Sequence, residues 1–405
     1  MTLAQEEPAP VQARGVSPYA WLVLGVVFVA GVSTALSQFE APPLLPPLMR
    51  WFRVDLASAS SLVSVFAVTG AVVALPSAYV LRRLGPTAAG VVALGTVVLG
   101  GAVGAVSPNF DLLLVSRGIE GLGLGLIAVV APTVIAAWFP PNHRGAAMGL
   151  WATWVPLGGV LMFNIAPGVA GGSDWRAVWW LGAAICLVAL VLFGLLVRLP
   201  RVAPAGGPTP APASQESLLR IAVSNRSIWV LALAFCIFNT GQAVASSFYP
   251  TFLVDQRGFS LAGASTLGSL LWLASIPSCL LGGVISDRLG SRKLVYTLPA
   301  VLMGLSWSLA FGVRGWEIPV YLVVAGLLTG AVATAVWTAA PEVMRRASAT
   351  GMGMAILMFG QSLGFVIGPA IFSRLVDSAG WQAAGFVWVP IGLSAAAVGW
   401  LVKVR

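Results

Sequence analysis

Three ionisable residues stand in otherwise apolar stretches, and their types are the ones best suited to chemistry: Glu40, Arg117 and Glu120. A charged side chain inside a bilayer costs about 2.5–3.5 kcal/mol or more, so such groups usually face a cavity or a partner of opposite charge. A carboxylate paired with a guanidinium can exchange that ion pair for a proton or for a bound solute. The three residues therefore predict a site of proton coupling or of substrate binding.

Two other interpretations of these residues are open in the sequence. Glu40 is followed by Pro42 and Pro43, which disturb a helix, so it can lie at the membrane–water interface. Arg117 can pair with Glu120, three residues further along the same helix face.

The elements that must position these residues are membrane helices. The chain is 58% hydrophobic and 9% charged, whereas soluble proteins carry roughly 25% charged residues. The apolar stretches are too long and uniform for barrel strands, and in lipid a helix satisfies its own backbone groups. At about 20 residues per span, we expect an all-α polytopic membrane protein with twelve transmembrane helices. The predicted spans are residues 19–45, 57–81, 87–107, 110–138, 146–170, 177–198, 227–252, 261–285, 294–313, 318–340, 349–373 and 381–402.

The net charge of +9 reflects membrane topology and not a nucleic-acid partner. With both chain ends in the cytoplasm, most of the 22 Lys and Arg residues fall in cytoplasmic loops, which is the positive-inside bias. We therefore expect a multi-pass protein of the cell's inner (plasma) membrane, with cytoplasmic N and C termini and the lipid bilayer around it.

A charged loop is repeated along the chain. Gly282–Lys293 read GGVISDRLGSRK, which is too polar for lipid and predicts a tight turn at the membrane surface. A weaker copy, AYVLRRLGPT, lies half a chain length earlier at Ala78–Thr87, with Arg82 where Asp287 stands. The repeat predicts two similar halves. The expected organisation is a cytoplasmic tail (1–18), an N-terminal six-helix bundle (19–199), a Pro-, Ala- and Gly-rich cytoplasmic linker (200–226) and a C-terminal six-helix bundle (227–405).

The twelve spans, the central linker and the repeated loop together resemble the major facilitator superfamily over nearly the whole chain. The start of the fourth span, LLLVSRGIEGLGLG, is similar to that family's fourth-helix motif, with Glu120 where Gln is common. In the family the first and fourth helices line a cavity between the bundles, which implies that Glu40 and Arg117 pair across it. The resemblance also implies an inner gate at the charged loop, formed by Gly283, Asp287, Arg288, Gly290, Arg292 and Lys293.

The same resemblance implies a substrate cavity lined by several spans. Asn239, Gln242 and Ser246 are spaced so that they share one face of the seventh span. Tryptophans inside spans can form an apolar or cation-stacking wall, although packing and hydrogen bonding between helices also account for such residues. The candidate cavity residues are Gln38, Trp151, Trp154, Asn239, Gln242, Ser246, Trp272, Trp337 and Gln361.

These features predict a secondary active transporter that moves a small organic solute by alternating access. The expected activity is uptake of a small organic acid or similar solute, with protons as the coupling ion. Proton-coupled export of apolar or cationic compounds is an alternative, and so is a non-transporting receptor or sensor on the same fold. We expect no enzyme, cofactor or metal, because the spans hold no nucleophile–base set and Cys186, Cys236 and Cys279 lack metal-ligand spacing. We also expect a monomer.

Overall fold

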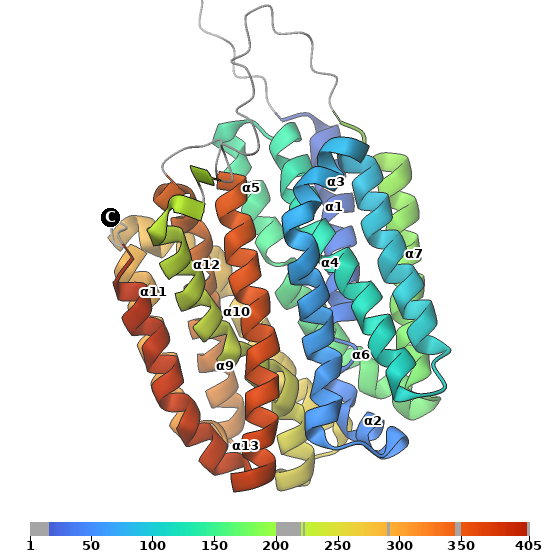
Figure 1. Ribbon diagram of the computed structural model, residues 1–405, viewed down its shortest axis with the longest axis vertical. Helices are drawn as coiled ribbons and strands as arrows, with labels where there is room; N and C mark the ends of the chain where they lie inside the picture. The colour runs from blue at the N-terminus through green and yellow to red at the C-terminus, as the bar shows by residue number, and fades with distance from the viewer. Residues whose placement is uncertain (1–15, 200–219, 222, 290–291, 345–349, 403–405) are drawn as a thin grey trace, which may run out of the picture.

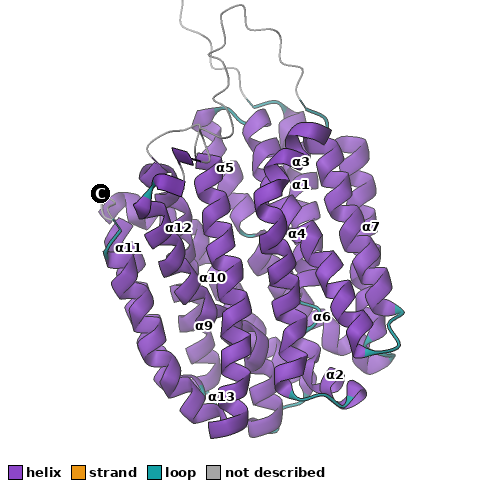
Figure 2. Cartoon of the chain, viewed as in Figure 1, coloured by secondary structure: helices purple, strands orange, loops and turns teal. Residues whose placement is uncertain are grey.

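The computed structural model describes residues 16–199, 220–221, 223–289, 292–344 and 350–402. Within these residues the chain is helical with no strand, as the sequence predicts (Figure 2). The elements are α1 (Pro18–Gln38), the short 3-10 helix η1 (Pro42–Leu44), α2 (Leu45–Phe52), α3 (Leu56–Ala105), α4 (Phe110–Trp138), α5 (Pro141–Ala152), α6 (Trp154–Gly172), α7 (Arg176–Leu196), α9 (Arg226–Arg257), α10 (Leu261–Leu289), α11 (Arg292–Ala310), α12 (Glu317–Met344) and α13 (Thr350–Trp400).

Eleven stretches of the described residues are long and apolar enough to cross a membrane. The last of them, Met352–Trp400, has 49 residues, about twice the length that a bilayer needs. It turns at Gly380, whose φ of 81° is a conformation that favours glycine. Counted as two spans, it brings the number to the twelve that the sequence predicts. Helix α3 turns in the same way at Gly85, where φ is 75°.

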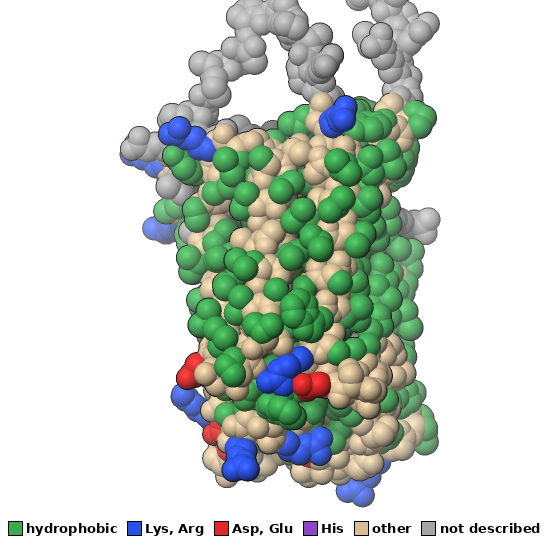
Figure 3. All heavy atoms as spheres, turned by 90° about the vertical axis from the view of Figure 1, so that its right-hand side faces the viewer, with side chains coloured by type: hydrophobic (Ala, Val, Ile, Leu, Met, Phe, Trp, Pro, Cys, Tyr) green, Lys and Arg blue, Asp and Glu red, His purple; other side chains and the backbone are tan. Residues whose placement is uncertain are grey.

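The spans run between two ends of the molecule, which we name from the chain. The linker end holds Leu196 of α7 and Arg226 of α9, and the distal end holds the turns before α3 and α4 (Figure 1). At the distal end Asp55 Oδ1 accepts a hydrogen bond from the Ser58 N–H at 2.8 Å and caps α3. Asn109 caps α4 by accepting from the Leu112 N–H at 2.9 Å. On the face that Figure 3 shows, charged side chains gather near the two ends and apolar ones cover the middle, as a lipid belt requires.

The helices pack as two groups. Helices α1, α3, α4, α6 and α7 contact one another on one side of the molecule, and α9 to α13 do so on the other (Figure 1). We call these the first and the second group. They meet mainly where α3 crosses α13 and where α6 crosses α10.

Two predicted spans are interrupted where prolines follow. The predicted first span, residues 19–45, is wrong at its end, because α1 stops at Gln38 and η1 follows at Pro42–Leu44. The fifth span is broken between α5 and α6 at Thr153. Pro156 has no N–H to donate to the Ala152 carbonyl, and Ala152 is the last residue of α5.

Most of the predicted gate lies outside the described side chains. Gly283, Asp287 and Arg288 belong to the last turns of α10 and Arg292 begins α11, but the structure does not describe their side chains. Gly290, the tail up to residue 15 and residues 200–219 of the linker are also outside the described residues. Lys293 is described, and its Nζ lies 5.3 Å from the centroid of the Trp400 ring.

Candidate functional site

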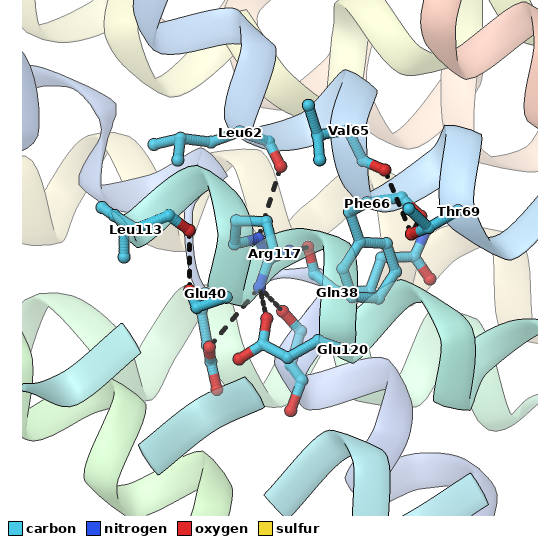
Figure 4. Close-up of polar contacts among 11 residues, drawn as sticks. Gln38, Glu40, Leu62, Val65, Phe66, Thr69, Leu113, Arg117 and Glu120 are labelled. Atoms are coloured by element: carbon cyan, nitrogen blue, oxygen red, sulfur yellow. Dashed lines mark hydrogen bonds and ion pairs between the residues drawn. The ribbon is translucent and has the colours of Figure 1, made fainter. Parts of the chain in front are cut away.

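The Arg117 guanidinium is the centre of a fully buried ionic site between α1, α3 and α4 (Figure 4). Its Nη1 lies 3.6 Å from Glu40 Oε2 and also contacts Glu120 Oε2. The side chains of all three residues are inaccessible to solvent. The structure thus brings together both pairs that the sequence leaves as alternatives, and we call Glu40, Arg117 and Glu120 the ionic triad.

Main-chain carbonyls also hold the guanidinium. Arg117 Nη1 donates to the Ser37 carbonyl at 2.8 Å, and Nη2 donates to the Gln38 carbonyl at 3.3 Å. Its Nε donates to the Leu62 carbonyl at 3.3 Å, and the cation lies 4.4 Å from the centroid of the Phe66 ring. The planar fork of arginine suits such a set of fixed acceptors, and a lysine could not satisfy them all.

Glu40 reaches Arg117 because the chain leaves the helical path at this point. After α1 ends at Gln38, residues 39–41 form an irregular segment that turns into η1. The Glu40 carboxylate lies against Gly182 of α7, where a Cβ atom would overlap Oε1. In the same way Gly100 of α3 leaves room for the Glu120 side chain. Glu40 is therefore enclosed by protein, and its side chain is inaccessible to solvent.

We expect Gly182→Ala to destabilise the protein by about 1–3 kcal/mol, the usual cost of an extra carbon in a packed interior. The added methyl group would push the Glu40 carboxylate away from Arg117. The measurement is the melting temperature of the purified protein in detergent.

Gly25→Ala on α1 is the matched control, because nothing lies within 4 Å of a Cβ atom there. Alanine also stabilises a helix interior by about 0.5–1 kcal/mol relative to glycine. Equal melting temperatures for the two variants would contradict the packing of Glu40 against Gly182.

The charges of the ionic triad do not balance when both carboxylates are ionised. With both carboxylates ionised, two negative charges face one positive charge in a fully buried place. An uncompensated buried charge costs several kcal/mol. One bound proton would make the triad neutral.

The polar residues of α9 lie in the second group and form contacts there. Asn239 Nδ2 donates to the Phe235 carbonyl at 2.7 Å, and Ser246 Oγ donates to the Ala243 carbonyl at 3.1 Å. The Oε1 atom of Gln242 accepts from Thr329 Oγ1 of α12 at 2.9 Å. These hydrogen bonds lie within the second group and do not involve the ionic triad.

The tryptophan candidates have three different surroundings. Trp151 and Trp154 stack at 4.9 Å between ring centroids on either side of the break in the fifth span. Trp337 packs edge-on against a phenylalanine of its own group, with 5.7 Å between the centroids. Trp272 of α10 reaches the first group, where its ring lies 4.7 Å from that of Phe39.

The remaining cavity candidates are two glutamines, and both are half-buried. Gln38 meets the ionic triad through its carbonyl, and Gln361 lies on α13. Sequence reasoning missed Phe66, Gly100 and Gly182, because an apolar or glycine residue in an apolar run carries no signal of the charge beside it. In the described part of the chain, no three His, Cys, Asp or Glu side chains gather in a metal-binding arrangement.

Comparisons with known proteins cover most of the chain. The family model of the Major Facilitator Superfamily matches residues 24–353 and 280–405. The hexuronate transporter of Bacillus subtilis (strain 168) is 26% identical over 306 residues, which are 71% of this chain and 71% of that protein. The chloramphenicol resistance protein of Streptomyces lividans is 27% identical over 292 residues, or 70% and 71% of the two chains.

The fold also has a solved counterpart. The crystal structure of a bacterial homolog to the human lysosomal transporter Spinster, in an inward-facing and unoccupied conformation, matches with a TM-score of 0.74. The identity is 19%, and the match covers 95% of this chain and 93% of that chain. At this identity the likeness is one of fold.

Proposed function

Since this chain belongs to the Major Facilitator Superfamily, a family of membrane transporters, we propose that it takes up a small organic acid or similar solute with protons as the coupling ion. The observation that carries the proposal is the ionic triad, a buried set of two carboxylates and one guanidinium. Binding of one proton neutralises this set. The triad can therefore be protonated when it is open to one side of the membrane and unprotonated when it is open to the other. Ionisable groups inside membrane proteins commonly form proton relays of this kind.

In this proposal the two groups are the moving bodies, with residues 19–199 in one, 227–405 in the other and 200–226 as the linker. Contacts at the distal end support closure there in the present structure. Helix α9 of the second group packs against η1 and α2 of the first group, which lie near that end. The bias of Lys and Arg toward the linker end favours a cytoplasmic position for that end. In this proposal the loop at Asp287 is the inner gate at that end.

The substrate class is argued from the charges and from the relatives. The hexuronate transporter is named for a sugar acid. Arg117, the one buried cation among the described residues, fits a singly charged anion better than a multiply charged one. The polar residues Asn239, Gln242, Ser246 and Gln361 and the tryptophans Trp151, Trp154 and Trp337 are the proposed substrate contacts. The relative named for chloramphenicol resistance favours the second candidate function, proton-coupled export of apolar or cationic compounds.

Flux into proteoliposomes tests the proposal. We expect a weak acid such as glucuronate to accumulate when the medium is one pH unit more acidic than the lumen. One proton per solute supports a gradient of about tenfold per pH unit, because 1.4 kcal/mol corresponds to a factor of ten. Lipophilic cations that leave the lumen under the same gradient, in exchange for entering protons, would support export, and ligand binding without any flux would support a receptor.

A further inference from the structure

Three aromatic side chains pack against one another where the two groups meet, beside the ionic triad. Phe39 of the first group lies 4.7 Å from Trp272 of the second, measured between ring centroids. Phe163 of α6 packs edge-on against Phe39, with 6.1 Å between the centroids. All three side chains are buried. We call Phe39, Phe163 and Trp272 the aromatic cluster.

Two glycines make the cluster possible by allowing close approach of α6 and α10. A Cβ atom at Gly159 of α6 would lie 2.7 Å from Trp272 Cγ, closer than real contacts allow. A Cβ atom at Gly268 of α10 would lie 3.1 Å from the Phe163 ring. Gly159 of the first group thus lies against the Trp272 ring of the second, and Gly268 of the second group lies against the Phe163 ring of the first. These two contacts fix the relative position of α6 and α10.

The cluster is joined to the ionic triad through one short segment. Phe39 and Glu40 are consecutive residues in the irregular stretch between α1 and η1. The Glu40 side chain faces Arg117 inside the first group, whereas the Phe39 side chain faces Trp272 of the second group. The segment lies between a helix end and η1, so a shift of its backbone displaces both side chains.

From this juxtaposition we propose that Trp272 is a positioning residue that links the protonation of Glu40 to the relative movement of the two groups. The inference rests on the proposed proton-coupled transport and adds a role that sequence reasoning does not give Trp272, which it places among the substrate contacts. A change in charge at Glu40 alters its attraction to Arg117, moves the irregular segment and changes the Phe39–Trp272 contact. In the other direction, relative movement of the two groups shifts the Phe39–Trp272 contact and, through the irregular segment, changes the position of Glu40.

The test measures coupling, not activity alone. The variants Trp272→Ala, Trp272→Phe and Phe39→Ala are reconstituted into proteoliposomes. Uptake of labelled glucuronate is recorded together with the luminal pH, which a trapped dye reports. If the wild type accumulates another weak acid instead of glucuronate, that acid is used. We expect Trp272→Ala and Phe39→Ala to let solute move down its gradient while pH-driven accumulation falls from about tenfold per pH unit toward unity. Trp272→Phe, which keeps a ring, should restore most of the accumulation. The variant with both alanine changes should be no worse than either alone, because the two residues act through one contact.

Trp388→Ala is the control, since this indole is also buried but contacts Trp307 and Phe372 within the second group. Its folded fraction should keep the wild-type ratio of protons to solute. An unchanged ratio in Trp272→Ala, with only a higher KM for the solute, would overturn the inference and leave Trp272 as a binding residue. A wild type that accumulates no solute would overturn the proposed function and the inference together.

Discussion

Glu40→Gln is expected to abolish pH-driven accumulation while leaving solute exchange intact. Glutamine has the shape of a protonated glutamate but cannot release a proton, so the ionic triad would stay in one charge state. The ratio of solute inside to outside should fall from about tenfold per pH unit to about one. Exchange of labelled for unlabelled solute needs no net proton movement and should continue. Accumulation and exchange are measured on the same preparation of proteoliposomes, accumulation with a pH gradient and exchange without one.

The control for this variant is Glu317→Gln. Glu317 is an exposed carboxylate in the first turn of α12, where it accepts a hydrogen bond from the Arg314 N–H. Its removal changes the net charge by the same amount and should leave accumulation as in the wild type. Full pH-driven accumulation by Glu40→Gln would show that the coupling proton binds elsewhere.

Arg117→Met is expected to destabilise the fold by about 3–5 kcal/mol, the cost of breaking a buried ion pair. Methionine can fill much of the space, but it leaves the buried carboxylates of Glu40 and Glu120 without a counter-ion. The carbonyls of Ser37, Gln38 and Leu62 lose a donor in the same change. The loss appears as a lower melting temperature in detergent and a smaller monodisperse fraction.

A second substitution separates charge from packing. Adding Glu120→Gln to Arg117→Met removes one of the two unpaired carboxylates and should recover part of the lost stability. Arg176→Met is the control, because Arg176 also pairs with a carboxylate, Asp174, and stacks on Trp175, but it is partly exposed. Exposed ion pairs contribute about 0–1 kcal/mol. A similar loss in Arg117→Met and Arg176→Met would contradict the importance of the buried pair.

The sequence predicts the membrane helices well because lipid demands long apolar runs. The fourth span is expected over residues 110–138, and α4 covers Phe110–Trp138. The family resemblance, drawn from the repeated loop and the glycines after Arg117, is confirmed by the family match. Irregularities within a span were harder to place. The breaks after Gln38 and at Thr153 lie several residues from the prolines that cause them, since a proline removes the partner of a carbonyl one turn earlier.

The sequence predicts only part of the site. Three charges in apolar runs are conspicuous, so Glu40, Arg117 and Glu120 could be named. The acceptors on Ser37, Gln38 and Leu62 are main-chain atoms, which every residue has and no sequence pattern marks. Spacing on α9 predicts a shared face for its polar residues, but a central helix has several neighbours. The choice of Thr329 as the partner of Gln242 depends on how the helices pack.

Arg117 also completes the end of α1. The final carbonyls of that helix, those of Ser37 and Gln38, accept from the guanidinium, and a helix C-terminus carries about half a negative charge. These acceptors do not titrate. When protons neutralise the carboxylates, the cation therefore still has neutral oxygen partners and is never left bare in the membrane. In the proposed proton-coupled cycle, these main-chain oxygens therefore hold the cation in both the protonated and the unprotonated site.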